Sequence, residues 1–431
     1  MIGQEKSKET GALVVRTLFN WILYGVGVGI LSGTAASLFL RGLDWVTATR
    51  MTHSWLLFLL PVGGAAVSYL YKRYGSQSIK GNNLIIEQIQ SELNVQRAEK
   101  QGILSPQPEP VAVPLRMAPL VLLGTWITHL LGGSAGREGT AVQLGGSLAD
   151  SYGRLLRVNR KDRSLLLICG IAGGFSSVFG TPLAGAVFGI EVIAIGLLRY
   201  QAIIPALIAS FSGHLITTEL WGVQHHHYEI GLIPAFSWLL LLKIATASIL
   251  FGLTSRLFSG LTRTFKQGFS RLFQNVMLKS AVGGILIIVL TYMLGTREYL
   301  GLSLPLLEQA FGGEAAPLAF LWKLVFTSLT LGTGFQGGEV TPLFIIGATL
   351  GHTLAGVLQV AAPFLAALGF IAVFCGASNT PLACFIMGME LFGMSGAGYM
   401  LMACIISYWC SGTKGIYTQE LHRSKLLLRR Q

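Results

Sequence analysis

Two glutamates in apolar, glycine-rich segments are the residues of this chain best placed to do chemistry. Glu138 lies within Gly133–Thr140 and Glu339 lies within Gly337–Pro342. Glycine disfavours a helix interior and proline fits a first turn, so both segments predict a helix start. Free N–H groups and the helix dipole attract anions there, and a carboxylate would mimic the anion that it displaces. On protonation it would leave the site, so such a glutamate could be both gate and proton carrier.

Each glutamate also has a structural interpretation. Glu138 could form a salt bridge with Arg137, but we expect adjacent side chains to diverge. Glu339 could pair with a base elsewhere in the chain, which the sequence does not identify. Two further acids, Glu191 and Glu390, stand late in their segments, and for these we expect structural hydrogen bonds at caps or across an interface.

The chain repeats itself about 200 residues apart. Gly136–Thr140 aligns with Gly337–Thr341, and Thr181–Glu191 aligns with Thr380–Glu390, at nearly the same offset. Duplicated halves of this kind are typical of transporters, which place an ion site between inverted repeats built from broken helices. We therefore expect an all-α membrane protein with inverted repeats. The predicted boundaries are a tail at 1–11, repeats at 12–220 and 230–421, a loop at 221–229 and a basic tail at 422–431.

Composition indicates a multi-pass membrane protein. Hydrophobic residues make up 52% of the chain, charged residues only 12%, and the mean hydropathy is +0.61. Soluble domains carry about 25% charged residues. Several apolar stretches are short or interrupted by glycine and proline, which predicts tilted helices that do not all cross. A buried acid is costly in a membrane and therefore indicates function at Glu138 and Glu339.

The net charge of +12 is concentrated between apolar stretches, at 154–163, 256–279 and 423–430. We attribute it to orientation with these loops in the cytoplasm and to attraction for lipid headgroups, and we expect no nucleic-acid partner. The five cysteines lack metal-ligand spacing and predict core packing. Residues 225–227, three consecutive histidines, predict a solvated loop more than a metal site, because neighbouring side chains point apart. Residues 84–100 predict an extramembranous helix, followed by a loop containing Pro106, Pro108 and Pro110.

An ordered set of motifs resembles the CLC family of anion channels and proton-coupled anion exchangers over nearly the whole chain. The motifs are, in order, 81–85, 136–140, 181–191, 337–342 and Tyr417. The resemblance implies a homodimer with one pathway in each subunit and no cofactor.

Departures from the chloride-type pattern resemble the bacterial fluoride-exporting branch of the family. Asn82 stands where serine is usual, Thr140 where proline is usual, and Val192 where an intracellular proton acceptor is usual. The resemblance assigns gating and proton transfer to Glu138, Glu339 and Thr341. It assigns anion contacts to a further set: Asn82, Gly136, Arg137, Gly139, Val340 and Tyr417.

Fluoride is small and strongly hydrated, so its site must replace water with close donors. The Asn82 amide, the Tyr417 hydroxyl and backbone N–H groups near Gly136 and Val340 could do so. Asn82 could instead cap a helix beginning at Asn83, and Tyr417 could be an interfacial aromatic residue.

The function that we predict is fluoride export driven by proton entry across a bacterial plasma membrane. A chloride or broad-halide exchanger, or a passive channel, is the alternative. An intramembrane hydrolase is disfavoured because no His or Cys stands within a helical turn of either acid and no H-E-x-x-H motif occurs. A non-transporting scaffold would leave two buried acids unexplained.

Overall fold

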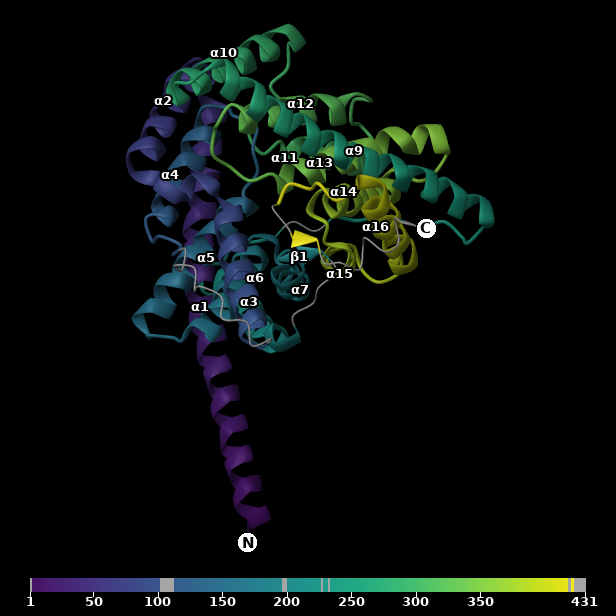
Figure 1. Cartoon of the computed structure of the whole chain (residues 1–431). Coiled ribbons are helices and arrows are strands. Elements are labelled where there is room, and N and C mark those ends of the chain that lie inside the picture. Colours follow the sequence, from purple (N-terminus) through teal and green to yellow (C-terminus); the bar gives the residue numbers. More distant parts are fainter. Residues whose placement is uncertain are drawn as a thin grey trace.

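The computed structural model describes residues 2–100, 112–195, 200–225, 228–231, 233–417 and 420–421, and they are almost entirely helical (Figure 1). The all-α prediction is therefore confirmed. The helices that precede the inter-repeat loop are α1 (Ile2–Thr52), α2 (Leu60–Leu70), α3 (Asn82–Lys100), α4 (Met117–Leu130), α5 (Glu138–Leu155), α6 (Arg160–Phe179), α7 (Pro182–Glu191) and α8 (Ile203–Leu215).

Those that follow the loop are α9 (Trp238–Leu272), α10 (Val276–Leu294), α11 (Leu304–Gly312), α12 (Ala319–Gly332), α13 (Val340–Leu358), α14 (Ala362–Ser378), α15 (Pro381–Phe392) and α16 (Ala397–Ser411). Short 3₁₀ or π-helical turns occupy Ser54–Leu59, Tyr71–Gly75, Ser76–Lys80, Tyr200–Ala202 and Ile216–Leu220. Two very short strands, β1 (Ala194–Ile195) and β2 (Glu420–Leu421), pair in parallel.

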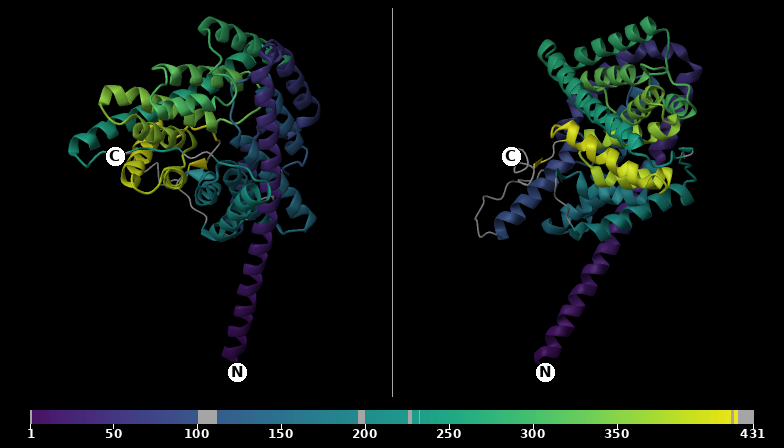
Figure 2. Two further views of the ribbon diagram at one scale, coloured as in Figure 1. Left: turned by 180° about the vertical axis from the view of Figure 1, so that it is seen from behind. Right: turned by 90° about the vertical axis from the view of Figure 1, so that its right-hand side faces the viewer.

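Seven of the described helices are long and apolar enough to cross a membrane, and the others are shorter. Among the short ones, α7 has 10 residues and α15 has 12. This mixture confirms the expected broken helices, because a straight span needs about 20 residues. The N-terminal end of α1 extends beyond the helical body in every view (Figure 2).

Equivalent helices of the two halves begin and end in the same way. A left-handed residue ends α6 at Gly180 and α14 at Asn379, with φ values of 73° and 57°. Thr-Pro then starts α7 and α15, because proline suits the first helical turn. The same local signals therefore build the same helix–turn–helix unit in each half, as the repeat predicts.

The halves cap each other's helices. The Glu390 carboxylate accepts the Leu183 and Ala184 N–H groups at the start of α7, at 2.9 and 2.8 Å. In return, Glu191 accepts the Leu382 and Ala383 N–H groups at the start of α15, at 3.1 and 2.8 Å. The structural hydrogen bonds expected of these two acids are confirmed. Each half therefore caps a helix of the other half with the equivalent glutamate, as expected when the halves are related by a two-fold axis.

Glu191→Gln and Glu390→Gln should each lower stability without changing ion selectivity. A glutamine accepts one of the two N–H groups and presents its own amide hydrogens to the other, which costs about 1 kcal/mol per site. Thermal unfolding of the purified variants, followed by loss of the monodisperse peak, measures this effect. A change of selectivity at unchanged stability would contradict a purely structural role.

The packing bears on several of the remaining sequence interpretations. Helix α3 forms over the predicted 84–100 segment, and Leu84, Ile85 and Ile89 on its apolar side are fully buried, whereas its predicted place outside the membrane is not tested. The loops that contain the prolines, His226, His227 and the basic tail lie outside the described residues, so those predictions remain untested. Among the cysteines, Cys169, Cys375, Cys384 and Cys404 are buried as expected.

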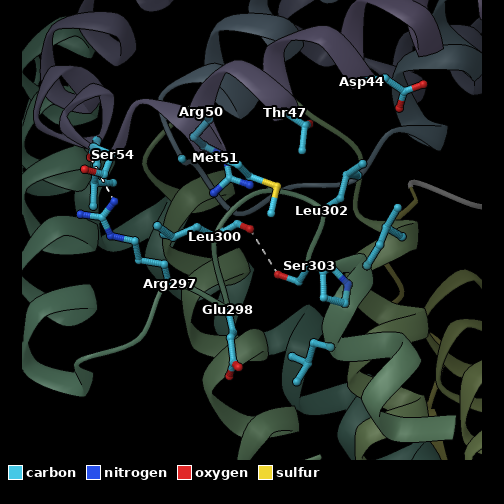
Figure 3. A pocket seen from close by; sticks show the side chains of 15 residues that line it. Asp44, Thr47, Arg50, Met51, Ser54, Arg297, Glu298, Leu300, Leu302 and Ser303 are labelled. Atoms are coloured by element: carbon cyan, nitrogen blue, oxygen red, sulfur yellow. Dashed lines mark hydrogen bonds between the residues drawn. The ribbon is translucent and has the colours of Figure 1, made fainter. Parts of the chain in front are cut away.

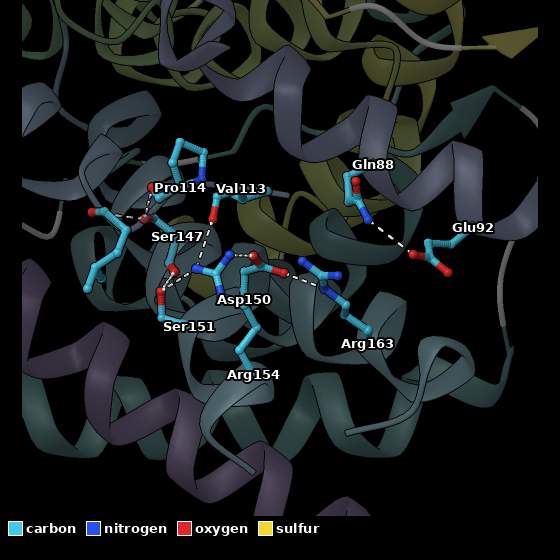
Figure 4. A network of polar contacts seen from close by, with 10 residues as sticks. Gln88, Glu92, Val113, Pro114, Ser147, Asp150, Ser151, Arg154 and Arg163 are labelled. Carbon is cyan, nitrogen blue, oxygen red and sulfur yellow. Dashed lines mark hydrogen bonds and ion pairs between the residues drawn. The ribbon is translucent and has the colours of Figure 1, made fainter. Parts of the chain in front are cut away.

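The basic cluster at 154–163 is partly neutralised, which its sequence does not show. The fully buried Asp150 accepts Arg163 Nε at 2.6 Å and lies 3.1 Å from Arg154 Nη1 (Figure 4). Arg154 also donates to the Val113 carbonyl at 3.3 Å. Two of the cluster's charges therefore hold the α5–α6 turn and are not free to attract lipid.

Candidate functional site

The Glu138 carboxylate of the first half lies at the start of helix α13 in the second half. It accepts the Thr341 N–H at 2.9 Å and the Thr341 hydroxyl at 2.5 Å. Glu138 is itself the first residue of α5 and is fully buried. The carboxylate thus occupies the anion position at a helix N-terminus, as its sequence context predicts.

Arg137 contributes to the same site, and here one expectation is wrong. Its N–H donates to Glu138 Oε2 at 3.2 Å, and its guanidinium Nε lies 3.5 Å from Oε1. The adjacent side chains therefore converge, because Arg137 precedes the helix and its φ of −114° departs from the helical value of about −63°. The contact is long and its guanidinium nitrogen has no hydrogen-bond partner among the described residues, so the Thr341 donors dominate.

Backbone pairing holds the two glutamate segments together. Gly136 N–H donates to the Gly338 carbonyl at 2.7 Å, and Gly338 N–H donates back to Gly136 at 2.8 Å. The Gly136 N–H is thus already engaged, and this geometry does not support its predicted contact with an anion. A side chain at Gly338 would meet Gly139 N at 2.8 Å, which explains why glycine is required there.

Asn82 lies beside the residue that follows Glu138. A Cβ atom placed on Gly139 would be 3.1 Å from Asn82 Nδ2. The helix begins at Asn82 itself, one residue earlier than the capping interpretation assumed. Its Oδ1 is buried without a hydrogen-bond partner among the described residues. The donor of this amide, Nδ2, lies on the side of Gly139, where it could donate to an anion beside the gate.

A small cavity of about 30 Å³ opens beside Glu138 and Thr341. Its wall is largely apolar and is formed by Phe179, Leu304, Leu307, Phe344, Phe370 and Leu391, with Arg137, His225 and Tyr228. The cavity is large enough for a water-sized solute. An ion that enters it must exchange its hydration shell for the few donors present.

Aromatic rings connect this cavity to Tyr417. Phe344 stacks on Phe370 with ring centroids 3.9 Å apart and meets the edge of Phe374 at 5.1 Å. Phe374 lies 5.9 Å from Phe188, which in turn lies 6.1 Å from Tyr417. Tyr417 is buried and close enough to Glu138 and Glu339 to interact with both electrostatically. This packing argues against a purely interfacial Tyr417.

Glu339 lies at the same helix start but is not in the same network. It precedes Val340, the first residue of α13, as its sequence predicts. Within the described residues its carboxylate forms no hydrogen bond or ion pair, and Lys266 is the cation that acts on it electrostatically. The two glutamates thus occupy equivalent positions of the repeat, but their carboxylates have different surroundings.

Sequence reasoning missed two contributors to this region. Lys323 of α12 is fully buried, and its ammonium donates to Ser134 Oγ, in the segment that leads to Glu138, at 2.9 Å. Its position as the single charged residue of an apolar helix is a sequence signal that would have indicated a functional or structural role. His225 lines the Glu138 cavity although it is 87 residues away, and only the fold could reveal that.

The family follows from the sequence match. Residues 63–412 match the family model described as "Voltage gated chloride channel". The chain belongs to this CLC family. A "Chloride/fluoride channel protein" of Pseudomonas syringae pv. tomato is 46% identical to this CLC protein over 414 residues, 94% of this chain and 87% of the relative.

Solved structures agree with that assignment. The crystal structure of a CLC-type fluoride/proton antiporter matches this CLC protein with a TM-score of 0.87 at 33% identity, over 94% of this chain and 98% of that one. Among sequence relatives, an H(+)/Cl(-) exchange transporter of Vibrio vulnificus is 27% identical over 318 residues, 67% of this chain and 66% of its own. The CLC fold with its two inverted repeats is therefore established for this chain.

Thr341→Val should weaken anion transport because it removes the hydroxyl donor that the Glu138 carboxylate occupies and that an anion replacing the carboxylate would need. Hydrogen bonds to charged groups contribute about 1.5–3 kcal/mol, so we expect the apparent affinity for the anion to fall roughly 10- to 100-fold. Thr341→Ser keeps the hydroxyl and is the matched control. Ion flux from liposomes at graded anion concentration measures the change, and equal loss in both variants would exclude a role for the hydroxyl.

Proposed function

We propose that this CLC protein exports fluoride in exchange for protons across a bacterial plasma membrane, with its basic loops in the cytoplasm, and acts as a transporter and not an enzyme. The observation that carries the proposal is the Glu138 carboxylate, which occupies the Thr341 donors at the start of α13 and the Arg137 N–H before α5. These donors are the ones that an anion in transit would need.

The proposed cycle alternates the carboxylate and the anion at one site. While ionised, Glu138 fills the site and blocks the path. Protonation removes its charge, so the Thr341 N–H and hydroxyl become available to a fluoride ion. The protonated carboxyl group can then donate to fluoride directly. One side chain thereby exchanges the anion for a proton.

Three features favour fluoride over chloride. Asn82 lies beside Gly139 and offers an amide donor where a small anion needs a close one. The cavity beside Glu138 is small and mostly apolar, which favours a compact ion whose hydration is replaced by few strong hydrogen bonds. A relative and a solved structure similar to this chain are a chloride/fluoride channel protein and a fluoride/proton antiporter.

Glu339 is proposed as the second proton site, which replaces the acid missing at Val192. It has no hydrogen bond or ion pair of its own within the described part of the chain, so its carboxylate can gain and lose a proton without breaking a network. Tyr417 would contact the anion between the two acids, since it lies near both. A homodimer with one pathway per subunit completes the proposal.

Purified protein in liposomes tests this function. A fluoride gradient is imposed with the voltage clamped at zero, and fluoride efflux and lumenal pH are recorded, then repeated with chloride. Protons driven against their own gradient by fluoride but not by chloride would support a selective exchanger. Fluoride flux without proton movement would indicate a channel, and equal chloride-driven exchange would remove the selectivity claim.

Asn82→Ser in the same assay separates the two halide alternatives. If the amide selects fluoride, the variant should gain chloride flux relative to fluoride. An unchanged ratio would assign selectivity elsewhere and favour a broad-halide exchanger.

A further inference from the structure

A second, larger cavity lies where the end of α1 meets the segment that joins α10 to α11 (Figure 3). Its volume is about 420 Å³. The wall comprises residues of α1 and the turn after it, Gly132, and residues of the 297–306 segment; the first group is Asp44, Thr47, Arg50, Met51, Ser54 and Leu57. Nothing in the proposed transport cycle uses this space.

The two arginines on this cavity form no ion pair with a carboxylate among the described residues. Arg50 Nε is shielded from solvent, and Arg50 forms no hydrogen bond or ion pair with any described residue. Arg297, on the same wall, donates to the Ser54 carbonyl at 3.1 Å and to no other group among the described residues. In Figure 3 the carboxylates of Asp44 and Glu298 point away from the Arg50 guanidinium.

A third cation lies directly behind the wall. The buried Lys323 donates to the Gly301 carbonyl and to Ser303 Oγ, both at 2.9 Å. Gly301 also contacts Arg50, since a Cβ atom there would lie 2.9 Å from Arg50 Nη2. Three positive charges thus lie close together, and none of them is ion-paired with a carboxylate among the described residues, although Asp44 and Glu298 line the same cavity. An anion in the cavity would relieve their mutual repulsion.

The surroundings indicate the depth of this cavity in the membrane. Trp45 and Trp55, five residues on either side of Arg50, are 67% and 56% exposed. Exposed tryptophans concentrate at the level of the lipid headgroups. Much of the wall is apolar and includes Leu57, Leu300, Leu302, Leu304 and Leu306, while Asp44, Thr47, Ser54, Glu298 and Ser303 add polar groups. A cavity whose wall carries both arginines and leucines can bind the phosphate of a lipid headgroup and an acyl chain at the same time.

We propose that this cavity binds the headgroup of an anionic membrane phospholipid, with Arg50 and Arg297 on the phosphate oxygens and an acyl chain along the leucines. The planar guanidinium fork suits phosphate. A free halide would make no use of the apolar wall.

Occupancy of the cavity would also reach the gate. Gly132 lines the cavity six residues before Glu138, and a Cβ atom there would touch Arg50 Cδ at 3.9 Å. Lys323 connects the same wall to Ser134. A bound phosphate would therefore hold the segment that carries Glu138 and raise the transport rate. This second consequence rests on the proposed function, whereas the binding does not.

Lipid retention by the full-length protein tests the binding directly. Protein is reconstituted in phosphatidylcholine vesicles with or without phosphatidylglycerol, extracted in mild detergent and measured by native mass spectrometry. Arg50→Gln/Arg297→Gln should retain on the order of tenfold less phosphatidylglycerol than the unchanged protein. Arg256→Gln/Arg271→Gln removes the same charge from exposed positions on α9 and should retain it fully.

Equal retention by both double variants would overturn the site and leave only general surface attraction. If the first variant fails to fold, Arg297→Gln alone serves, because Arg297 is exposed and its loss leaves no buried group unpaired. Inorganic phosphate added to phosphatidylcholine vesicles separates the sources: retention or activation by phosphate alone would overturn the lipid assignment. Loss of retention at unchanged fluoride flux would reject only the link to the gate.

Discussion

Glu138→Gln is expected to stop fluoride from driving protons while fluoride itself still crosses the membrane. Glutamine has the size of the protonated acid, but it cannot carry a proton and has no charge to compete with fluoride for the Thr341 donors. A positioned proton-transfer group typically contributes a factor of about 100 or more, so fluoride-driven acidification should fall on that order. Simultaneous recording of lumenal pH and fluoride efflux checks both parts.

The matched control is Glu314→Gln, which changes an exposed glutamate in the loop after α11. It should leave both fluxes unchanged. Fluoride-coupled proton movement that persists in Glu138→Gln would contradict the gate assignment and transfer the proton to another acid, with Glu339 the first to test. Loss of both fluxes would instead mean that the carboxylate is needed to open the path.

Lys323→Met is expected to destabilise the protein and to loosen the gate. The Lys323 ammonium holds Ser134 Oγ, the Gly301 carbonyl and Ser303 Oγ, each at 2.9 Å. Removing it leaves these buried acceptors without their donor, at a cost of roughly 2–4 kcal/mol. For a chain of this size we expect the Tm to fall by about 5 °C.

A functional measurement separates positioning from stability alone. Because Ser134 leads directly to Glu138, fluoride should leak without moving protons in Lys323→Met even well below its Tm. Lys72→Met, at an exposed position, is the control and should change neither Tm nor coupling. A variant with lower Tm but intact coupling would limit Lys323 to a structural role.

Much of the site could be predicted from local sequence because helix starts are local features. Glycine and proline around Glu138 and Glu339 mark N-termini, and the structure places both residues there. The repeat also predicted that Glu191 and Glu390 act across the halves, because matching positions must be related by the symmetry of the fold.

Contacts between distant segments could not be predicted in this way. The Arg137–Glu138 approach and the engagement of Gly136 N–H by Gly338 depend on the backbone path where two segments cross. The buried cations Arg50 and Lys323 read as isolated charges in the sequence, and only their packing around residues 299–303 shows that they are neighbours.

The exchanged caps of α7 and α15 have a consequence for how the chain is made. The N–H groups at the start of α7 cannot form their hydrogen bonds until Glu390 has been synthesised, and Glu390 is 207 residues after Leu183. At ribosomal rates of about 5–20 residues per second, that interval is roughly 10–40 s. Throughout it, the newly inserted first half exposes an uncapped helix end inside the bilayer. During membrane insertion, the uncapped N–H groups of the first half therefore need a temporary partner. Neither half can reach its final fold before the last helices have been synthesised.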